Sequence, residues 1–136
     1  MKIVKIFSLF ALLIGLSTSC TAQGEKSNNE SSVKQANEVT VYYFHNARRC
    51  TTCKAVEAES KKAVEALYGD KVPFEAYNLE SDAGEQKAKE VGASGQSLLI
   101  VSGDKKINIT NQGFLNARKN PEKLKQVIKE KTDPLI

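Results

Sequence analysis

The pair Cys50-Thr-Thr-Cys53 most constrains what this chain can fold into, because it stands where an apolar run gives way to a helical pattern. Residues 39–44 (VTVYYF) are β-branched and aromatic, as expected of a buried strand. From about residue 50 to 67, apolar and small side chains recur along one stripe, which predicts a helix. Two cysteines three residues apart on one helical face can form a disulfide with little backbone movement.

The segments after this helix have equally clear patterns. Their predicted elements are a strand over 72–79, a helix from an Asp82 N-cap with Glu85 three residues later to about 91, a strand over 98–101, its hairpin partner over 106–110, and a last helix begun by Asn120 and Pro121. The order is β-α-β-α-β-β-α. Strands separated by helices are expected to run parallel where they pair, with the hairpin as an antiparallel edge. We therefore predict an α/β fold of three layers around a central mixed sheet, the thioredoxin-like fold.

A cysteine at the start of a helix lies beside unpaired backbone N–H groups and the positive end of the helix dipole, which favour its thiolate. Arg48, Arg49 and Lys54 flank the pair and add positive charge. Only the thiolate exchanges with disulfides. We therefore predict that Cys50 is the nucleophile of a thiol–disulfide oxidoreductase and that Cys53, one turn inward, resolves the mixed disulfide.

Further candidate site residues lie on either side of the dithiol. His45, the sole histidine, ends the first strand and could accept a proton from the buried thiol. Thr51 and Thr52 stand between the cysteines, and the turn before the third strand offers Gln96 and Ser97 to a substrate groove. Thioredoxin-fold proteins usually carry a cis-proline in that turn. Here no proline is present, and we expect a trans bond, since a non-proline cis bond costs ~2.5–4 kcal/mol.

Three other uses of the pair stay open from the residues alone. A CxxC can supply half of a zinc site, but His45 is the only other soft ligand besides Cys20, and we predict no metal or other cofactor. The pair could instead be a static disulfide in a non-catalytic binding module of the same fold. It could also bind a soft metal or an arsenical through two thiolates.

The N-terminus has the pattern of an export signal. Lys2 and Lys5 precede an apolar run over 6–16, which is too short for a permanent membrane anchor, and small residues then lead to Cys20. A lipoprotein peptidase would cut before Cys20 and leave it acylated, whereas an ordinary signal peptidase could cut after Ala22. We predict a lipoprotein signal over 1–19, a lipid anchor and disordered tether over 20–37, and one domain over 38–136.

Charge excludes one class of partner. The whole chain has 20 basic and 16 acidic residues, and removal of residues 1–19 takes away only Lys2 and Lys5, which lowers the net charge from +4 to +2. The remaining basic residues are spread along the chain, so nucleic-acid binding is not expected.

The chain resembles one family more narrowly. A Phe44-His45 element, the core Arg49-Cys-Thr-Thr-Cys53 and a late segment with Gly113-Phe114, Arg118 and Asn120 are similar to the ArsF family of small exported thioredoxin-like bacterial proteins, described as nitrophenyl compound nitroreductase subunits. The resemblance covers roughly residues 39–131. It implies a role in reducing aromatic nitro compounds or arsenicals, in which this chain would donate thiols rather than hold a flavin.

These observations combine into one hypothesis. The chain is expected to be exported and held by lipid on Cys20 to a bacterial membrane, with its domain in the periplasm or cell envelope. There the dithiol would reduce a protein or small-molecule disulfide. Its electrons would come from a membrane protein that relays them through thiols.

Overall fold

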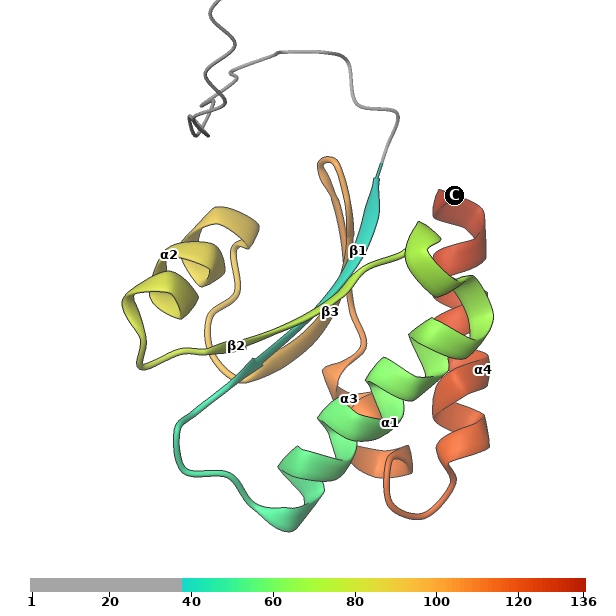
Figure 1. Cartoon of the computed structure of the whole chain (residues 1–136), viewed down its shortest axis with the longest axis horizontal. Coiled ribbons are helices and arrows are strands. Elements are labelled where there is room, and N and C mark those ends of the chain that lie inside the picture. The colour runs from blue at the N-terminus through green and yellow to red at the C-terminus, as the bar shows by residue number, and fades with distance from the viewer. Residues whose placement is uncertain (1–37) are drawn as a thin grey trace, which may run out of the picture. The chain divides into compact units, whose positions relative to one another are not determined.

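Residues 38–136 are the part of the chain that the computed structural model describes. They form a four-stranded mixed sheet with helices on both faces (Figure 1). The strands are β1 (Val39–His45), β2 (Phe74–Asn78), β3 (Ser97–Ser102) and β4 (Lys105–Asn108). The helices are α1 (Thr51–Tyr68), α2 (Asp82–Val91), α3 (Thr110–Asn116) and α4 (Pro121–Thr132), with short 3-10 turns at Gly69–Lys71 and Asp133–Leu135. The predicted signal, tether and Cys20 lie outside the described residues.

The sheet has the strand order β2-β1-β3-β4. β1 pairs with β2 in parallel, whereas β3 runs antiparallel to both β1 and β4. The expectation that the first three strands run parallel is therefore wrong for β3. The chain leaves α2 at the carboxyl end of β1, where Ser97 pairs with Phe44, so β3 starts there and runs back along β1. This order and these directions are those of the thioredoxin-like fold.

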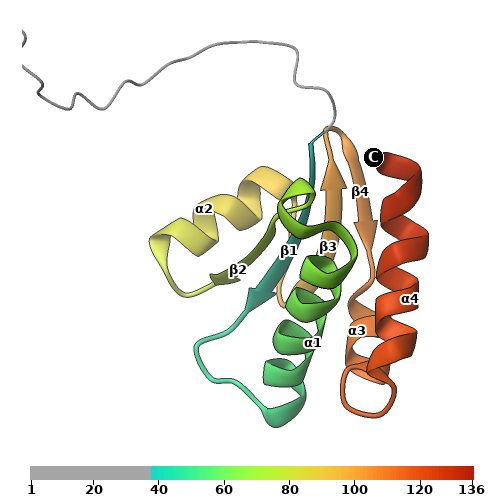
Figure 2. The ribbon, with the colours of Figure 1, turned by 45° about the vertical axis from the view of Figure 1, so that its right-hand side comes forward.

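The helices form a layer on each side of the sheet. α2 covers one face alone, and α1, α3 and α4 cover the other (Figures 1 and 2). Alternation along β1 divides the core between them, because Val41 and Tyr43 belong to the larger cluster while Phe44 packs in the smaller one with Leu99 of β3. The larger cluster also holds Leu98 and Ile100 of β3 and Leu124 and Ile128 of α4, all fully buried. The last helix, α4, thus packs an apolar face onto the sheet.

The N-terminus of α2 differs from the expectation by one residue. The N-cap is Ser81, not Asp82, because the Ser81 Oγ accepts a hydrogen bond from the Gly84 N–H at 3.1 Å. The same hydroxyl donates to the Asn78 carbonyl at 2.8 Å. Ser81 therefore ties the start of the helix to the end of β2, which an aspartate, lacking a proton to donate, would not do.

α3 was not expected, because residues 106–110 are predicted to form a single strand. The strand ends at Asn108, and Thr110 starts a helix whose sequence, TNQGFLN, has weak helix propensity. Packing supplies what propensity lacks: an added methyl group on Gly113 would lie 3.1 Å from Leu98 and 3.3 Å from Val56, so α3 lies directly against β3 and α1. The Thr110 hydroxyl also accepts from the Leu98 N–H at 2.9 Å.

Across residues 38–136, none of the helices combines the length and the apolar character that a membrane span requires.

The C-terminal turn is tied to α1 by Tyr68, whose hydroxyl donates to Asp133 at 2.7 Å. Burial and this hydrogen bond raise the pKa of Tyr68. A group with a raised pKa in the folded state stabilises fully below its unfolded pKa, ~10 for tyrosine, and loses that contribution as pH rises further.

We expect the stability difference between wild type and Tyr68→Phe to shrink as pH rises from 9 to 11, measured by urea unfolding at each pH. Asp133→Asn is expected to weaken the same pH dependence, because it removes the carboxylate that holds the phenol proton. A difference between wild type and Tyr68→Phe that stays constant over this range would contradict the assignment.

Candidate functional site

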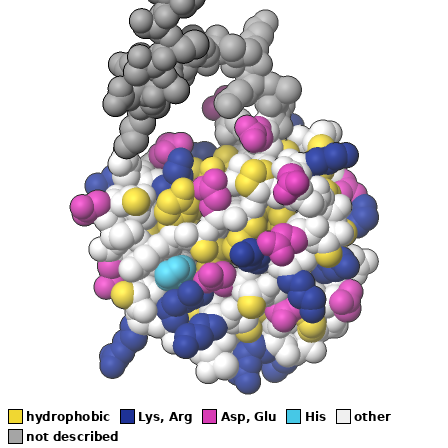
Figure 3. Space-filling view, in the orientation of Figure 1, with side chains coloured by type: hydrophobic (Ala, Val, Ile, Leu, Met, Phe, Trp, Pro, Cys, Tyr) yellow, Lys and Arg dark blue, Asp and Glu magenta, His cyan; other side chains and the backbone are white. Residues whose placement is uncertain are grey.

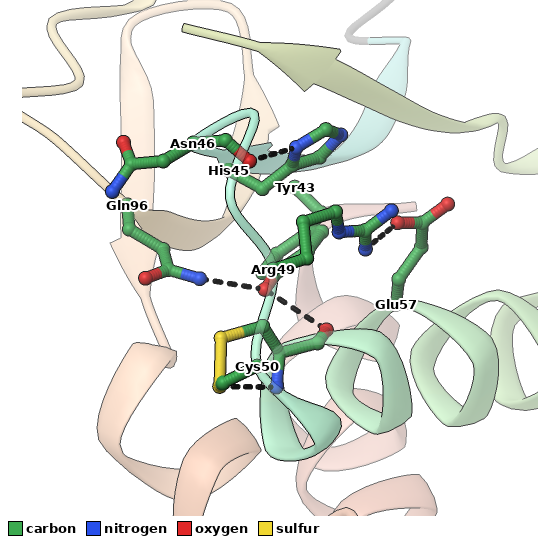
Figure 4. The surroundings of a disulfide bond; sticks show 8 residues. Tyr43, His45, Asn46, Arg49, Cys50, Glu57 and Gln96 are labelled. Carbon is green, nitrogen blue, oxygen red and sulfur yellow. Dashed lines mark hydrogen bonds and ion pairs between the residues drawn. A yellow bond between two sulfur atoms is a disulfide. The ribbon is translucent and has the colours of Figure 1, made fainter.

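The two predicted redox cysteines form a disulfide, with their Cα atoms 5.1 Å apart (Figure 4). Cys50 is the N-cap of α1 and is exposed, and its Sγ accepts a hydrogen bond from the Cys53 N–H at 3.1 Å. Cys53 is 7% exposed. The outer sulfur thus lies among the free amides of the helix start, where negative charge is stabilised, and the inner sulfur is shielded from solvent.

A buried tyrosine connects the dithiol to the turn before β3. The Tyr43 hydroxyl donates to the Cys53 carbonyl at 3.0 Å and accepts from the Gln96 side-chain amide at 3.0 Å (Figure 4). Tyr43 is completely buried, and burial raises its pKa, so the phenol keeps its proton. One fixed link therefore joins the first turn of α1 to the predicted substrate groove.

The Arg49 side chain is half-buried rather than extended into solvent. Its guanidinium forms an ion pair with Glu57 and lies over the Tyr43 ring, with 5.9 Å from Cζ to the ring centroid (Figure 4). Glu57 lies one turn after Cys53 on α1. Much of the Arg49 charge is therefore balanced by a carboxylate, which leaves less of it to act on Cys50.

We expect Glu57→Gln to raise the reduction potential of the disulfide by about 10–30 mV, because it removes a negative charge and frees the Arg49 cation, and both changes favour the reduced thiolate. The measurement is the potential in dithiol redox buffers. Glu65→Gln is the matched control, since Glu65 pairs with Lys61 near the other end of α1. An unchanged or lowered potential in Glu57→Gln would contradict this reading.

The other predicted charged residues lie around the dithiol with different surroundings. Arg48 and Lys54 are exposed, and neither forms an ion pair within residues 38–136. The Nδ1 of His45 lies 3.0 Å from the Asn46 carbonyl oxygen, and its ring lies against Tyr43 at 5.9 Å between centroids. His45 thus turns toward the β1–α1 loop. Its role as a proton acceptor stays a prediction.

The predicted groove residues separate into two groups. Gln96 and Ser97 lie at the start of β3, beside a hollow of about 600 Å³ whose lining residues are all uncharged. Ser97 is nearly buried, and its hydroxyl donates to the Gly95 carbonyl at 3.0 Å. Thr51 is exposed and Thr52 is half-buried at the edge of a second, smaller hollow. No peptide bond within residues 38–136 is cis, so the bond between Gln96 and Ser97 is trans as expected.

No group of three or more His, Cys, Asp or Glu side chains in residues 38–136 has the arrangement of a metal site.

Sequence reasoning missed three contributors to this site. Tyr43 lies on the same face of β1 as Val39 and Val41, and the period-2 alternation that places it there is visible in the sequence. Glu57 follows Cys53 at the i+4 spacing, which places it on the same helical face. The hollow beside Thr52 depends on α3, which propensity alone does not predict.

Comparison with known proteins gives no family model that matches and no curated relative. Among solved structures the chain is similar to thioredoxin f2 of Chlamydomonas reinhardtii, at 17% identity over 74% of this chain and 85% of that one, with a TM-score of 0.49. It is also similar to mitochondrial thioredoxin 3 of Saccharomyces cerevisiae in its oxidised form, at 23% identity over 69% and 79% of the two chains, with a TM-score of 0.46. The resemblance to the ArsF family is not confirmed.

Proposed function

We propose that this protein is a thiol–disulfide oxidoreductase in which Cys50 attacks and Cys53 resolves. The observation that carries the proposal is the unequal placement of the two sulfurs. Cys50 is exposed at the N-cap of α1 with an amide N–H on its Sγ, and Cys53 lies one turn inward at 7% exposure. A substrate can reach the first sulfur, whereas the second can react only with a disulfide already formed at the first.

The reaction balances as two exchanges. The Cys50 thiolate attacks one sulfur of the substrate disulfide, forms a bond to it and releases the other sulfur as a thiolate. The Cys53 thiolate then attacks the Cys50 sulfur, closes the Cys50–Cys53 disulfide and releases the second substrate thiolate. The substrate gains two electrons and takes up its protons from solvent. A donor dithiol must then reduce the Cys50–Cys53 disulfide to complete the cycle.

The first test is the reduction potential of the pair in the full chain carrying Cys20→Ser, which leaves the dithiol as the only thiols. We expect ready exchange in glutathione and dithiothreitol buffers and a potential between about −120 and −270 mV. A Cys50–Cys53 disulfide whose reduction potential lies below about −300 mV, so that these buffers do not open it, would be a structural bond. That result would overturn the proposal in favour of a binding module.

We propose further that the domain works at a membrane outside the cytoplasm and is reduced there by a membrane protein. Export and acylation at Cys20 would place it on a membrane outside the cytoplasm, near a membrane protein that relays electrons through thiols. Tethering raises the effective concentration of the domain toward such a donor. Cys20→Ser is expected to move the protein from the membrane fraction to the soluble fraction of cells. Retention in the membrane fraction would contradict the lipid anchor.

A further inference from the structure

A second feature of the dithiol end is a hollow of about 220 Å³ between the start of α1 and the residues from α3 onward. Its lining residues are Thr52, Phe114, Leu115, Arg118 and Lys119, and we call them the α3 surface. Thr52 stands between the two cysteines, so the α3 surface begins directly beside the reactive bond. Figures 1 and 2 agree that the loop after α3 lies at the same end of the molecule as the start of α1.

The α3 surface exposes a large apolar side chain that the core does not use. Leu115 is 71% exposed, and among residues 38–136 only Ile136, the last residue of the chain, is a comparably exposed large hydrophobic residue. Phe114, next to it, is half-buried. α3 is held firmly behind Leu115, since Gly113 packs against Leu98 and Val56. Phe114 and Leu115 therefore form an apolar centre in the hollow that Thr52 also lines.

The same surface is basic. Arg118 and Lys119 are exposed, and no ion pair within residues 38–136 involves either of them. Arg48 and Lys54 add two further exposed cations near the dithiol. Figure 3 shows Lys and Arg side chains gathered below the single histidine, at the end of the molecule where α1 begins.

Two carboxylates near the dithiol have partners within the domain. Glu57 is paired with Arg49, and Glu80 accepts a hydrogen bond from the Ala47 N–H at 2.8 Å. The α3 surface therefore presents an apolar centre beside two exposed cations, Arg118 and Lys119, that form no ion pair within residues 38–136.

We propose that the α3 surface docks a polypeptide partner in which an apolar residue and acidic residues flank the disulfide that Cys50 attacks. This inference rests on the proposed function, because docking positions a disulfide for exchange. The apolar residue would lie against Leu115 and Phe114, and the acidic residues would face Arg118 and Lys119. A second copy of this chain fits less well, because a symmetric contact would bring two sets of cations together.

The test compares two model peptides that differ only in charge. Each carries one leucine and one cysteine, joined by a disulfide to 2-mercaptoethanol, and has either two aspartates or two lysines beside the cysteine. The reduced full chain carrying Cys20→Ser is mixed with each peptide, and the second-order rate constant of exchange is measured. We expect the acidic peptide to react about tenfold faster at low salt, falling below about threefold at 1 M salt.

Variants locate the effect. Arg118→Glu with Lys119→Glu is expected to abolish or reverse the preference for the acidic peptide. Lys71→Glu with Lys105→Glu, the same charge change at exposed positions away from the dithiol end, is expected to preserve it. Leu115→Ala is expected to slow exchange with the acidic peptide about three- to tenfold. It should leave exchange with hydroxyethyl disulfide, which is small and uncharged, unchanged.

The controls separate failure of this inference from failure of the proposed function. A reduced chain that does not exchange even with hydroxyethyl disulfide would overturn the proposed function itself. Exchange with hydroxyethyl disulfide but equal rates for the two peptides would overturn only the docking inference. A wild-type dimer in sedimentation equilibrium that Leu115→Ala abolishes would assign the α3 surface to a second copy instead, and would also overturn it.

Discussion

A Cys50→Ser variant is expected to lose disulfide reduction almost completely, by about a thousandfold or more in rate constant with hydroxyethyl disulfide. The serine hydroxyl does not ionise near neutral pH and forms no mixed disulfide. The remaining thiol, Cys53, is 7% exposed and cannot replace it. The measurement is the rate of thiol release from the small disulfide, with both chains carrying Cys20→Ser.

Cys53→Ser is the informative counterpart, because it should keep the first exchange and lose the second. With the resolving thiol gone, the mixed disulfide on Cys50 has no internal attacker and should accumulate, visible as an added half of the substrate in the intact mass. The rate of its formation should stay within a few-fold of wild type. Accumulation of the adduct on Cys53 in the Cys50→Ser variant instead would reverse the two assignments.

The placement of the dithiol was predictable because it follows from local patterns. A β-branched and aromatic run, two cysteines three residues apart and an amphipathic stripe after them determine a strand, a junction and a helix without reference to the rest of the chain. The structure has β1 and α1 within a residue or two of the predicted bounds. The start of α4 is equally local, since the Asn120 side chain caps the Lys123 N–H and Pro121 occupies the first turn.

The direction of β3 and the existence of α3 were not predictable in this way. Whether the chain leaves α2 at one end of β1 or the other depends on how the helix packs across the sheet, which no pattern within residues 82–97 specifies. α3 depends on contacts of Gly113 with Leu98 and Val56, which are far from it in sequence. The same holds for the link from Gln96 through Tyr43 to Cys53, because its three members come together only in the folded sheet.

Gly84 shows most clearly what only the structure contains. It is buried in the first turn of α2. A Cβ atom there would lie 1.9 Å from the Asn78 carbonyl oxygen and 2.6 Å from the Asn78 carbonyl carbon. In an exposed helix interior, replacing glycine by alanine stabilises by about 1 kcal/mol. Here the methyl group would meet the backbone at the end of β2, so α2 must move away from the sheet.

We therefore expect Gly84→Ala to destabilise the protein by about 1–3 kcal/mol, the cost typical of an overpacked contact, in spite of the better helix propensity of alanine. Urea unfolding measures the change. The control is the neighbouring exposed position, where Ala83→Gly is expected to destabilise by up to about 1 kcal/mol through propensity alone. Alanine is thus favoured at 83 and glycine at 84.

The Gly84→Ala variant also tests whether a shift of α2 on one face of the sheet affects the dithiol at the start of α1 on the other face. α2 packs on the face of the sheet opposite α1, so the folded fraction of Gly84→Ala should exchange with hydroxyethyl disulfide within about twofold of wild type. Equal or greater stability than wild type would show that α2 can shift without cost. A large loss of exchange in the folded protein would show instead that the position of α2 reaches the dithiol through β3 and Gln96, and that the groove and the redox pair act as one unit.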